Sequence, residues 1–213
     1  MKALHSSTVT LGRRLSAAQA DRRAQLVAAA RALATEGGYE AVTISALCER
    51  AGVARATFYH YFGSKDHVLG EAIVQWGHER MEELRRHSPT GRTPCERAIG
   101  TLRWVLEAVL RDPQLIGAHV QSMVSPDLGV GETQRELASL VAGYLEVGLG
   151  PTADAVDLEA VSTILSHVFF SSLMNMTAGR TSAATVLEDL TLAARLLLEP
   201  QARSVRRPRR ASA

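Results

Sequence analysis

One short segment of the chain carries hydrogen-bonding side chains at helical spacing. Arg55 precedes Tyr59 by four residues, and Ala56 precedes His60 by the same interval. Residues four apart share a face of a helix, so these side chains would line one surface. Arginine can reach a phosphate or a guanine edge, and tyrosine and histidine can donate to phosphates. The segment is therefore suited to binding a polyanion such as a nucleic acid.

The other side of the same segment is apolar. Phe58 lies four residues before Phe62, which predicts a face packed on a core. Just upstream, residues 51–53 fit a tight turn containing Gly, and Thr43 can cap a preceding short helix. A support helix, such a turn and a second helix with one free face make a helix-turn-helix. We therefore predict this motif over residues 43–62.

Three residues could complete a frame for phosphates around this motif. Thr43 and Ser64 are placed to begin helices, whose free backbone N–H groups and dipole attract anions. Lys65 adds a positive charge beside Ser64. These groups would position the motif without reading bases. For each hydroxyl taken singly, capping of its own helix remains the alternative.

The elements that must position these residues are all predicted to be helices. Helical spacing recurs along most of the chain and no period-two strand pattern stands out, so the predicted fold class is all-α. Ser16 with Gln19 fits a capping box, and Thr93 followed by Pro94 fits another helix start. We expect about nine helices. Their predicted ranges are 16–37, 43–50, 54–61, 64–87, 93 to about 109, 113–124, 132–149, 154–177 and 182–199.

The net charge of +2 is distributed unevenly along the chain. Residues 1–66 hold nine Lys or Arg against five acids, and residues 67–200 hold ten against seventeen. A basic front on an acidic middle suggests that the front meets a polyanion. The expected parts are a flexible basic arm over 1–15, a helix-turn-helix domain over 16–66, a second helical domain over 67–200, and a disordered Arg-rich tail over 201–213.

The sequence favours neither a membrane protein nor a metal site. Residues 160–179 carry no charge over 20 positions, but eight of them are polar, so a buried helix is favoured over a membrane span. No histidine is expected to pair at a spacing of four with a cysteine or a carboxylate so as to make a closed metal site, although His119 and His167 could meet in three dimensions. We expect no metal and no other cofactor. Cys48 is expected in the core. With two cysteines and no secretory signal, we expect a cytoplasmic protein.

A set of residues between about positions 20 and 70 adds a family resemblance. They are Gly38-Tyr39, Thr43-Ile44, Leu47-Cys48, Ala51-Gly52-Val53, Thr57-Phe58-Tyr59-His60-Tyr61-Phe62, Ser64-Lys65-Asp66 and Leu69. In this order and spacing they resemble the N-terminal DNA-binding domain of the tetracycline-repressor (TetR) family. The resemblance implies a homodimeric transcriptional regulator, usually a repressor. In such a regulator a divergent C-terminal domain binds a small ligand and dimerises through its last two long helices.

The same resemblance implies roles for single residues. Residues expected at the DNA backbone are Thr43, Thr57, Tyr59, His60 and Lys65, and those expected at base edges are Arg55 and Ala56. Two positions depart from the family pattern, since Ala56 stands where Gly is frequent and Cys48 where Ala is frequent. A methyl group at position 56 could contact a thymine methyl or shift the approach of the helix. The operator therefore does not follow by analogy.

Ligand candidates in the second half are chosen on physical grounds, as polar or polarizable side chains within otherwise apolar helices. They are Trp104, His119, Met123, Tyr144, His167, Phe170, Met174 and Asn175. For each of them, a place in the core or in an interface is the alternative. An aromatic content of 5% and the lack of charge clusters favour an apolar or mixed small-molecule effector.

The C-terminal helices favour a homodimer. The predicted helix over 154–177 has an uncharged stretch too broad for one apolar stripe, which suggests a second face covered by a partner subunit. With the last helix, over 182–199, it would form an intersubunit four-helix bundle. Two recognition helices would then lie about 34–36 Å apart, which matches a palindromic operator in double-stranded DNA.

The sequence thus predicts a sequence-specific DNA-binding transcriptional regulator, a repressor released by a small molecule, and not an enzyme. Two alternatives stay open. A ligand-independent architectural DNA-binding protein would need no long uncharged C-terminal helices. An all-helical enzyme would need a catalytic motif, and the sequence offers no Gly-rich phosphate loop and no nucleophile elbow.

Overall fold

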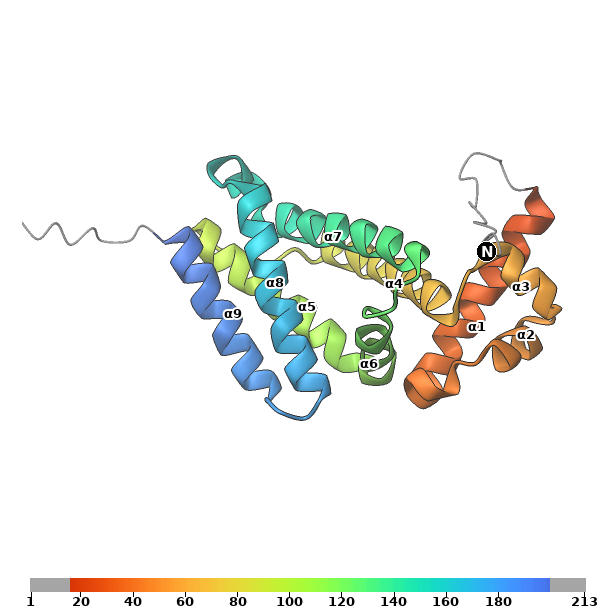
Figure 1. Cartoon of the computed structure of the whole chain (residues 1–213). Coiled ribbons are helices and arrows are strands. Elements are labelled where there is room, and N and C mark those ends of the chain that lie inside the picture. The colour runs from red at the N-terminus through yellow and green to blue at the C-terminus, as the bar shows by residue number, and fades with distance from the viewer. Residues whose placement is uncertain (1–15, 200–213) are drawn as a thin grey trace, which may run out of the picture.

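The computed structural model describes residues 16–199, and within this range it contains nine α-helices, one 3-10 helix and no strand (Figure 1). The elements are α1 (Ala17–Ala41), α2 (Ile44–Ala51), α3 (Arg55–Tyr61), α4 (Lys65–Arg86), α5 (Pro94–Arg111), α6 (Pro113–Ser122), α7 (Leu128–Leu149), η1 (Gly150–Ala155), α8 (Leu158–Thr177) and α9 (Ala183–Leu198). The all-α fold class is thereby confirmed. We term α1–α3, at the right of Figure 1, the head and α5–α9 the body; α4 joins them. The predicted basic arm and Arg-rich tail lie outside the described residues.

Side-chain caps set the helix starts that the sequence predicts well. Ser16 and Gln19 form the expected capping box at the start of α1. The Thr93 hydroxyl accepts from the backbone N–H of Glu96 at 3.2 Å, and Pro94 is the first residue of α5. Because a capping hydrogen bond joins residues about three apart in the sequence, its formation depends little on the rest of the fold.

Two predicted starts are wrong, and caps explain both. α7 begins earlier than predicted, at Leu128, because the Asp127 carboxylate accepts from a backbone N–H in the first turn at 2.8 Å. α8 begins later than predicted, at Leu158, because Asp157 caps it and the 3-10 helix η1 occupies the preceding residues. In each case an aspartate that the helical pattern did not single out defines the boundary.

α1 is kinked near its C-terminal end. Gly37 and Gly38 depart from helical geometry, and Gly38 has a φ of +67°, a region that favours glycine. A Cβ atom at Gly38 would lie 2.9 Å from Oε1 of Gln114 in α6. The kink therefore turns the chain toward α2 and also lets α6 approach α1 closely.

The apolar core of the head extends into α4 and α6. Phe58 of α3 and Leu26 of α1 are fully buried, and Cys48 is buried with them as predicted. Residues of the same cluster that come from α4 and α6 are Val68, Leu69, Ala72, Ile73, Trp76, Leu115, Ile116 and Ala118. The Trp76 indole N–H also donates to the Asp112 carboxylate at 2.7 Å, next to the start of α6. Packing thus crosses the predicted domain boundary at residue 66.

Two more clusters form the body. One joins α5, α7, α8 and α9 and includes Leu106, Leu149, Leu165 and Leu190. The other joins α4 to α7 around Tyr144. None of the helices within residues 16–199 combines the length and the apolar character needed to cross a membrane.

Two ion pairs link α1 to α4. Arg31 Nη1 donates to both carboxylate oxygens of Glu79, at 2.7 and 2.8 Å, and Arg23 pairs with Glu71. The paired residues are eight apart in each helix, so the ion pairs join α1 to α4 at two separate levels. Partly exposed pairs of this kind contribute little to stability, but they fix how the connecting helix lies along the head.

Candidate nucleic-acid interface

The helix-turn-helix predicted over residues 43–62 is present as α2, a turn and α3. Gly52 ends α2 with a φ of +64°, and the Val53 N–H donates to the Cys48 carbonyl at 3.0 Å. A left-handed residue at this place is the usual way to end a helix sharply. The turn therefore sets the angle at which α3 leaves α2.

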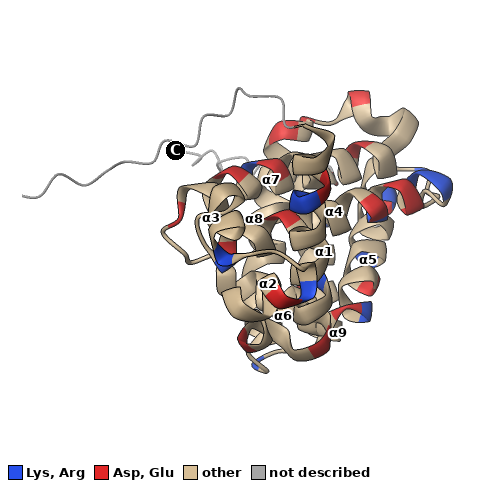
Figure 2. Cartoon of the chain, turned by 90° about the vertical axis from the view of Figure 1, so that its right-hand side faces the viewer, with Lys and Arg blue, Asp and Glu red and all other residues tan. Residues whose placement is uncertain are grey.

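α3 has one buried and one exposed face. Phe58 is 0% exposed and Tyr61 is buried, whereas Arg55, Ala56, Tyr59 and His60 are exposed and Thr57 is half-buried. Tyr59 exposes 55% of its surface, which is far more than packing on the head would leave. Figure 2, turned so that the head faces the viewer, shows α3 and α2 on this side of the molecule. The hydrogen-bonding side chains on α3 are thus available to a partner.

Thr43 and Ser64 cap the two helices that flank this surface. The Thr43 hydroxyl oxygen accepts from the Ala46 N–H at 3.2 Å, and that of Ser64 accepts from the His67 N–H at 3.1 Å. Each hydroxyl keeps its own O–H as a donor. Capping and phosphate binding are therefore compatible roles for both residues.

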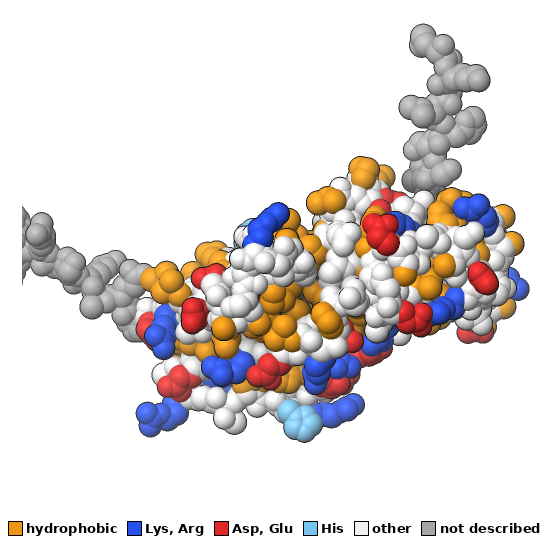
Figure 3. All heavy atoms as spheres, turned by 90° about the horizontal axis from the view of Figure 1, so that it is seen from below, with side chains coloured by type: hydrophobic (Ala, Val, Ile, Leu, Met, Phe, Trp, Pro, Cys, Tyr) orange, Lys and Arg blue, Asp and Glu red, His pale blue; other side chains and the backbone are white. Residues whose placement is uncertain are grey.

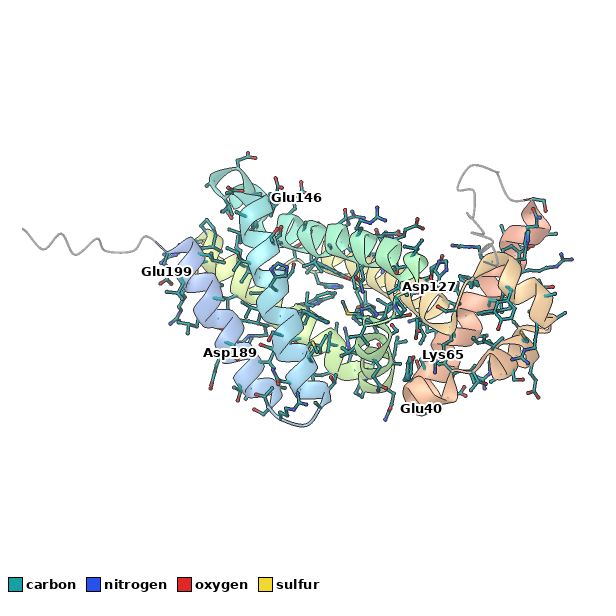
Figure 4. All side chains as sticks on the ribbon, in the orientation of Figure 1. Glu40, Lys65, Asp127, Glu146, Asp189 and Glu199 are labelled. Carbon is teal, nitrogen blue, oxygen red and sulfur yellow. The ribbon has the colours of Figure 1, made fainter. Side chains whose placement is uncertain are left out.

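Lys65 lies beside the end of α1. Its ammonium group sits 3.6 Å from the centre of the Tyr39 ring and donates to the Tyr39 carbonyl at 3.3 Å. Figure 4 labels Lys65 and Glu40 near the junction of α1 and α4. The same carbonyl accepts from the Val42 N–H at 3.2 Å, in the turn that leads to Thr43. The ammonium group is thus held close to the start of α2.

An exposed ion pair lies between α1 and α2. Arg50 makes two hydrogen bonds to the Glu36 carboxylate, at 2.6 and 2.8 Å. Chiefly through these hydrogen bonds, Arg50 lowers the pKa of Glu36. The pair neutralises one of the cations of the head, so Arg55 and Lys65 are better placed than Arg50 to meet a polyanion.

The eight ligand candidates do not gather in one place. Trp104 and Tyr144 pack with their ring centres 6.2 Å apart. The Tyr144 hydroxyl donates to the Gly77 carbonyl at 2.5 Å, which ties α7 to α4. Burial raises the pKa of Tyr144 well above its usual range, so the hydroxyl stays protonated.

Two further candidates lie on α6 and at its end. His119 is buried, and its Nδ1 has no hydrogen-bond partner among the described residues. Burial lowers the pKa of His119 to about 4. The Met123 side chain is half-buried, and its carbonyl accepts from the Gln134 amide at 2.9 Å. Of the eight, His119 carries the clearest unused hydrogen-bonding capacity.

The four candidates on α8 lie on its outer side. His167 and Met174 are exposed, and Phe170 is half-buried. These three follow each other at intervals of three and four residues, so they share one helix face. Asn175 donates to the Ser171 carbonyl at 3.0 Å, one turn earlier in α8. The structure therefore separates this face from Trp104, Tyr144 and His119.

Two polar groups in α4 were not predicted. His67 Nε2 lies 3.5 Å from Glu71 Oε1 at a spacing of four, which is an ion pair of two residues and not a closed metal site. That spacing is visible in the sequence. Arg80 pairs with Glu83 at 3.0 Å, yet its Nε is buried without a partner among the described residues. Within residues 16–199, no three His, Cys, Asp or Glu residues gather closely enough to hold a metal.

An open groove of about 490 Å³ lies where the head meets the body. It is bordered by the last turn of α1, by α6 and by the ends of α5 and α8, with Tyr39, Gln114 and Met176 among its lining residues. None of the eight ligand candidates is among those residues. The groove is therefore separate from the predicted ligand set.

The outer faces of α8 and α9 expose large apolar side chains. Ile164 and Leu192 expose 45% and 58% of their surfaces, and Met174 exposes 39%. Figure 3 shows hydrophobic side chains (orange) at the surface among charged ones, in a view from below. Exposed apolar side chains on two neighbouring helices are typical of a protein interface.

Two family models together match most of the chain. Residues 26–72 match the model described as bacterial regulatory proteins, tetR family, and residues 91–197 match the model described as tetracyclin repressor-like, C-terminal domain. The HTH-type transcriptional repressor KstR of Rhodococcus jostii (strain RHA1) is 36% identical over 183 residues, which are 86% of this chain and 85% of the relative. KstR of Mycobacterium tuberculosis (strain ATCC 25618 / H37Rv) is 31% identical over 87% of this chain and 84% of its own.

Solved structures share the fold. A TetR transcriptional regulator from Rhodococcus sp. RHA1 has a TM-score of 0.71 at 24% identity, over 86% of this chain and 99% of that one. Thermus thermophilus FadR, a TetR-family repressor solved in complex with lauroyl-CoA, has a TM-score of 0.61 at 24% identity, over 90% and 99%. At these identities the likeness concerns the arrangement of helices.

Proposed function

The chain belongs to the tetR family of bacterial regulatory proteins, and from this premise we propose how it binds DNA, how it pairs and where its effector lies. It is a DNA-binding transcriptional regulator, a repressor that responds to a small molecule. The observation that carries the proposal is the surface of α3, where hydrogen-bonding side chains are exposed opposite the buried Phe58.

We propose that α3 enters the major groove. Arg55 and Ala56 face base edges in this arrangement, because they lie in the first turn of the exposed α3, where recognition helices contact bases. Residues proposed to contact phosphates are Thr43, Thr57, Tyr59, His60, Ser64 and Lys65. The exposure of Tyr59 and His60 and the helix-start positions of Thr43 and Ser64 support this assignment.

Arg55→Ala is expected to weaken binding to the specific operator by about 1–3 kcal/mol, because a bidentate contact to a base is lost. The measurement is the dissociation constant for operator DNA and for random duplex DNA at fixed salt. Tyr59→Phe is the matched variant on the same face and is expected to weaken both DNAs alike. An equal loss on both DNAs for Arg55→Ala would make Arg55 a phosphate contact instead.

We also propose that two subunits pair through α8 and α9. The exposed Ile164, Met174 and Leu192 support this, since pairing would remove their apolar surface from water. Four helices would then form one bundle with two-fold symmetry. Symmetry would place the two α3 helices about 34–36 Å apart, so the operator would be palindromic.

Leu192→Ala is expected to raise the dissociation constant of the dimer about tenfold, because part of an interface side chain is removed. Analytical ultracentrifugation over a dilution series measures this constant. Leu128→Ala is the control, because Leu128 exposes 88% of its surface on α7, away from the proposed interface. The proposed interface would be wrong if both variants dissociated like the unchanged protein.

The effector is proposed to bind in the body, beside His119 and the Trp104–Tyr144 pair, as an apolar or mixed molecule. The Nδ1 of His119, which has no partner among the described residues, and the surrounding apolar helices support this. The fold can hold such a molecule, since the Thermus thermophilus FadR of the same fold was solved with lauroyl-CoA. Of the remaining candidates, Met123 is the C-cap of α6. The candidates better placed for the subunit interface are His167, Phe170, Met174 and Asn175.

Release of DNA is proposed to work through α4 and α6. Both helices contribute to the core of the head, so an effector that displaces them would rotate the head and separate the two α3 helices. Only a difference in effector affinity between the two states can shift the population, and couplings of about 1–3 kcal/mol are typical.

The test is DNA binding to the fragment that flanks the protein's own coding region, at several salt concentrations and with a panel of small molecules. We expect one protected palindromic site and at least one compound that weakens binding. If footprinting found no protected site, or if affinity were the same on every sequence, an architectural role would replace the proposed one.

A further inference from the structure

Lys65 stands at a position that helix stability alone disfavours. It is the first residue of α4, where the positive end of the helix dipole repels a cation. The neighbouring Asp66 suits this place, since an acid in the first turn interacts favourably with the dipole. A lysine kept at a position where it weakens the helix suggests that Lys65 serves a purpose other than helix stability.

Tyr39 contacts both Lys65 and Asp66. Its ring lies under the Lys65 ammonium group at 3.6 Å, and its carbonyl accepts from the same group at 3.3 Å. Its hydroxyl donates to Asp66 Oδ1 at 2.8 Å. The anionic side chain and the cationic one, adjacent in sequence, are thereby fixed by one aromatic residue from α1.

The Tyr39 hydroxyl is a donor at neutral pH. Burial, followed by the hydrogen bond to Asp66, raises the pKa of Tyr39 to about 12. The hydrogen bond from this hydroxyl places the Asp66 carboxylate beside the phenol, on the side of α1. A carboxylate free to turn would repel a phosphate near Lys65.

Tyr39 itself is fixed by the fold around it. It follows Gly38, whose φ of +67° lies in the turn near the end of α1. It also lines the groove between the head and the body. Its hydrogen bond to Asp66 and its contact with Lys65 then hold the side chain against the start of α4.

We propose that Tyr39 is a positioning residue for DNA binding, which holds the Lys65 ammonium group toward a phosphate and turns the Asp66 carboxylate away from it. This inference rests on the proposed phosphate contact of Lys65. A lysine side chain has a long flexible stem, so a preset ammonium group loses less freedom when DNA arrives.

The experiment measures affinity for a short random-sequence duplex over a range of salt concentrations. Lys65→Ala is expected to reduce the slope of log affinity against log salt by about 0.9 for each subunit bound, because one phosphate contact is lost. Tyr39→Leu removes the ring and the hydroxyl, and it is expected to lower affinity about two- to fivefold and to reduce the slope in the same direction. Tyr39→Phe keeps the ring but releases Asp66, so it is expected to retain the slope while lowering affinity, because the freed carboxylate repels the phosphate.

The combination of both changes separates positioning from a general structural effect. The double variant Tyr39→Leu with Lys65→Ala is expected to show the same salt slope as Lys65→Ala alone, because the Tyr39 ring acts through Lys65. An additive loss of slope, or an unchanged slope for Tyr39→Leu, would overturn the inference. Should Lys65→Ala leave the slope unchanged, the inference fails, while Arg55→Ala on the operator still tests the proposed function.

An NMR measurement on the wild-type protein tests the same contact even if the Tyr39→Leu variant does not fold. The ring current of Tyr39 should shift the NMR signals of the Lys65 ε-methylene group upfield in the wild-type protein. Tyr39→Phe is expected to preserve this shift. Signals at the ordinary lysine position in the folded wild-type protein would contradict the proposed contact.

Discussion

Phe58→Ala is expected to lower the free energy of unfolding by about 3–5 kcal/mol, the usual loss for a fully buried phenylalanine. Phe58 is 0% exposed. Its ring centre lies 5.8 Å from that of Phe62 and 5.4 Å from that of Tyr59. Its removal would leave a cavity at the point where α3 is held on the core of the head, so specific DNA binding should fall with stability.

Chemical denaturation followed by circular dichroism measures this loss. Tyr59→Ala is the matched variant on the same helix, because Tyr59 exposes 55% of its surface. It should cost far less stability while still weakening DNA binding, so the pair separates folding from binding. A loss below about 1 kcal/mol for Phe58→Ala would mean that α3 is not anchored through this ring.

Acidification is expected to destabilise the protein through His119. Burial lowers the pKa of His119 to about 4 in the folded protein, whereas an unfolded chain has the ordinary value of about 6.5. Between these two values the unfolded chain binds the proton and the folded chain does not. Stability therefore falls as the pH drops from about 6.5 toward 4, with a full loss of about 3 kcal/mol, and His119 has no effect above that window.

The measurement is the free energy of unfolding at several pH values, compared between the wild-type protein and His119→Phe. The comparison matters because the Glu36–Arg50 pair, in which the carboxyl pKa is lowered, also weakens in acid. The difference between the two proteins should shrink or reverse in favour of His119→Phe as the pH falls below 6.5. Parallel pH curves would show that His119 takes up no proton on unfolding in this range.

The same histidine gives a second readout for the proposed effector site. An effector atom that accepts or donates a hydrogen bond at Nδ1 would satisfy a nitrogen that has no partner among the described residues. Such a bond would change the pH at which His119 titrates. Following its ring signals by NMR during effector binding would therefore link the acid response to the ligand.

Local signals made much of the fold predictable. Ser16, Thr43, Ser64 and Thr93 each cap the helix that the sequence assigns to them. The start of α7 at Leu128 and the start of α8 at Leu158 were missed. Both depend on aspartates whose capping role is clear only when the preceding turn has a defined path.

The proposed DNA-binding surface could also be predicted from the sequence. The four-residue spacing of Arg55 and Tyr59 gives the exposed face, and Phe58 gives the buried one, because a helix repeats every 3.6 residues. The position of a ligand site could not be predicted in the same way. Apolar helices look alike in sequence whether their polar residues face a pocket, a core or a partner, and the structure separates His119 from His167 on this point.

The sequence by itself determined the helices, the helix-turn-helix and the faces of α3, since these follow from caps, glycine turns and periodicity within a few residues. The tertiary structure alone decided that α6 completes the core of the head and that Tyr39 lies under Lys65. The physical reason is that periodicity states which side of a helix is apolar but not which distant helix covers it. That choice depends on the packing of all helices at once.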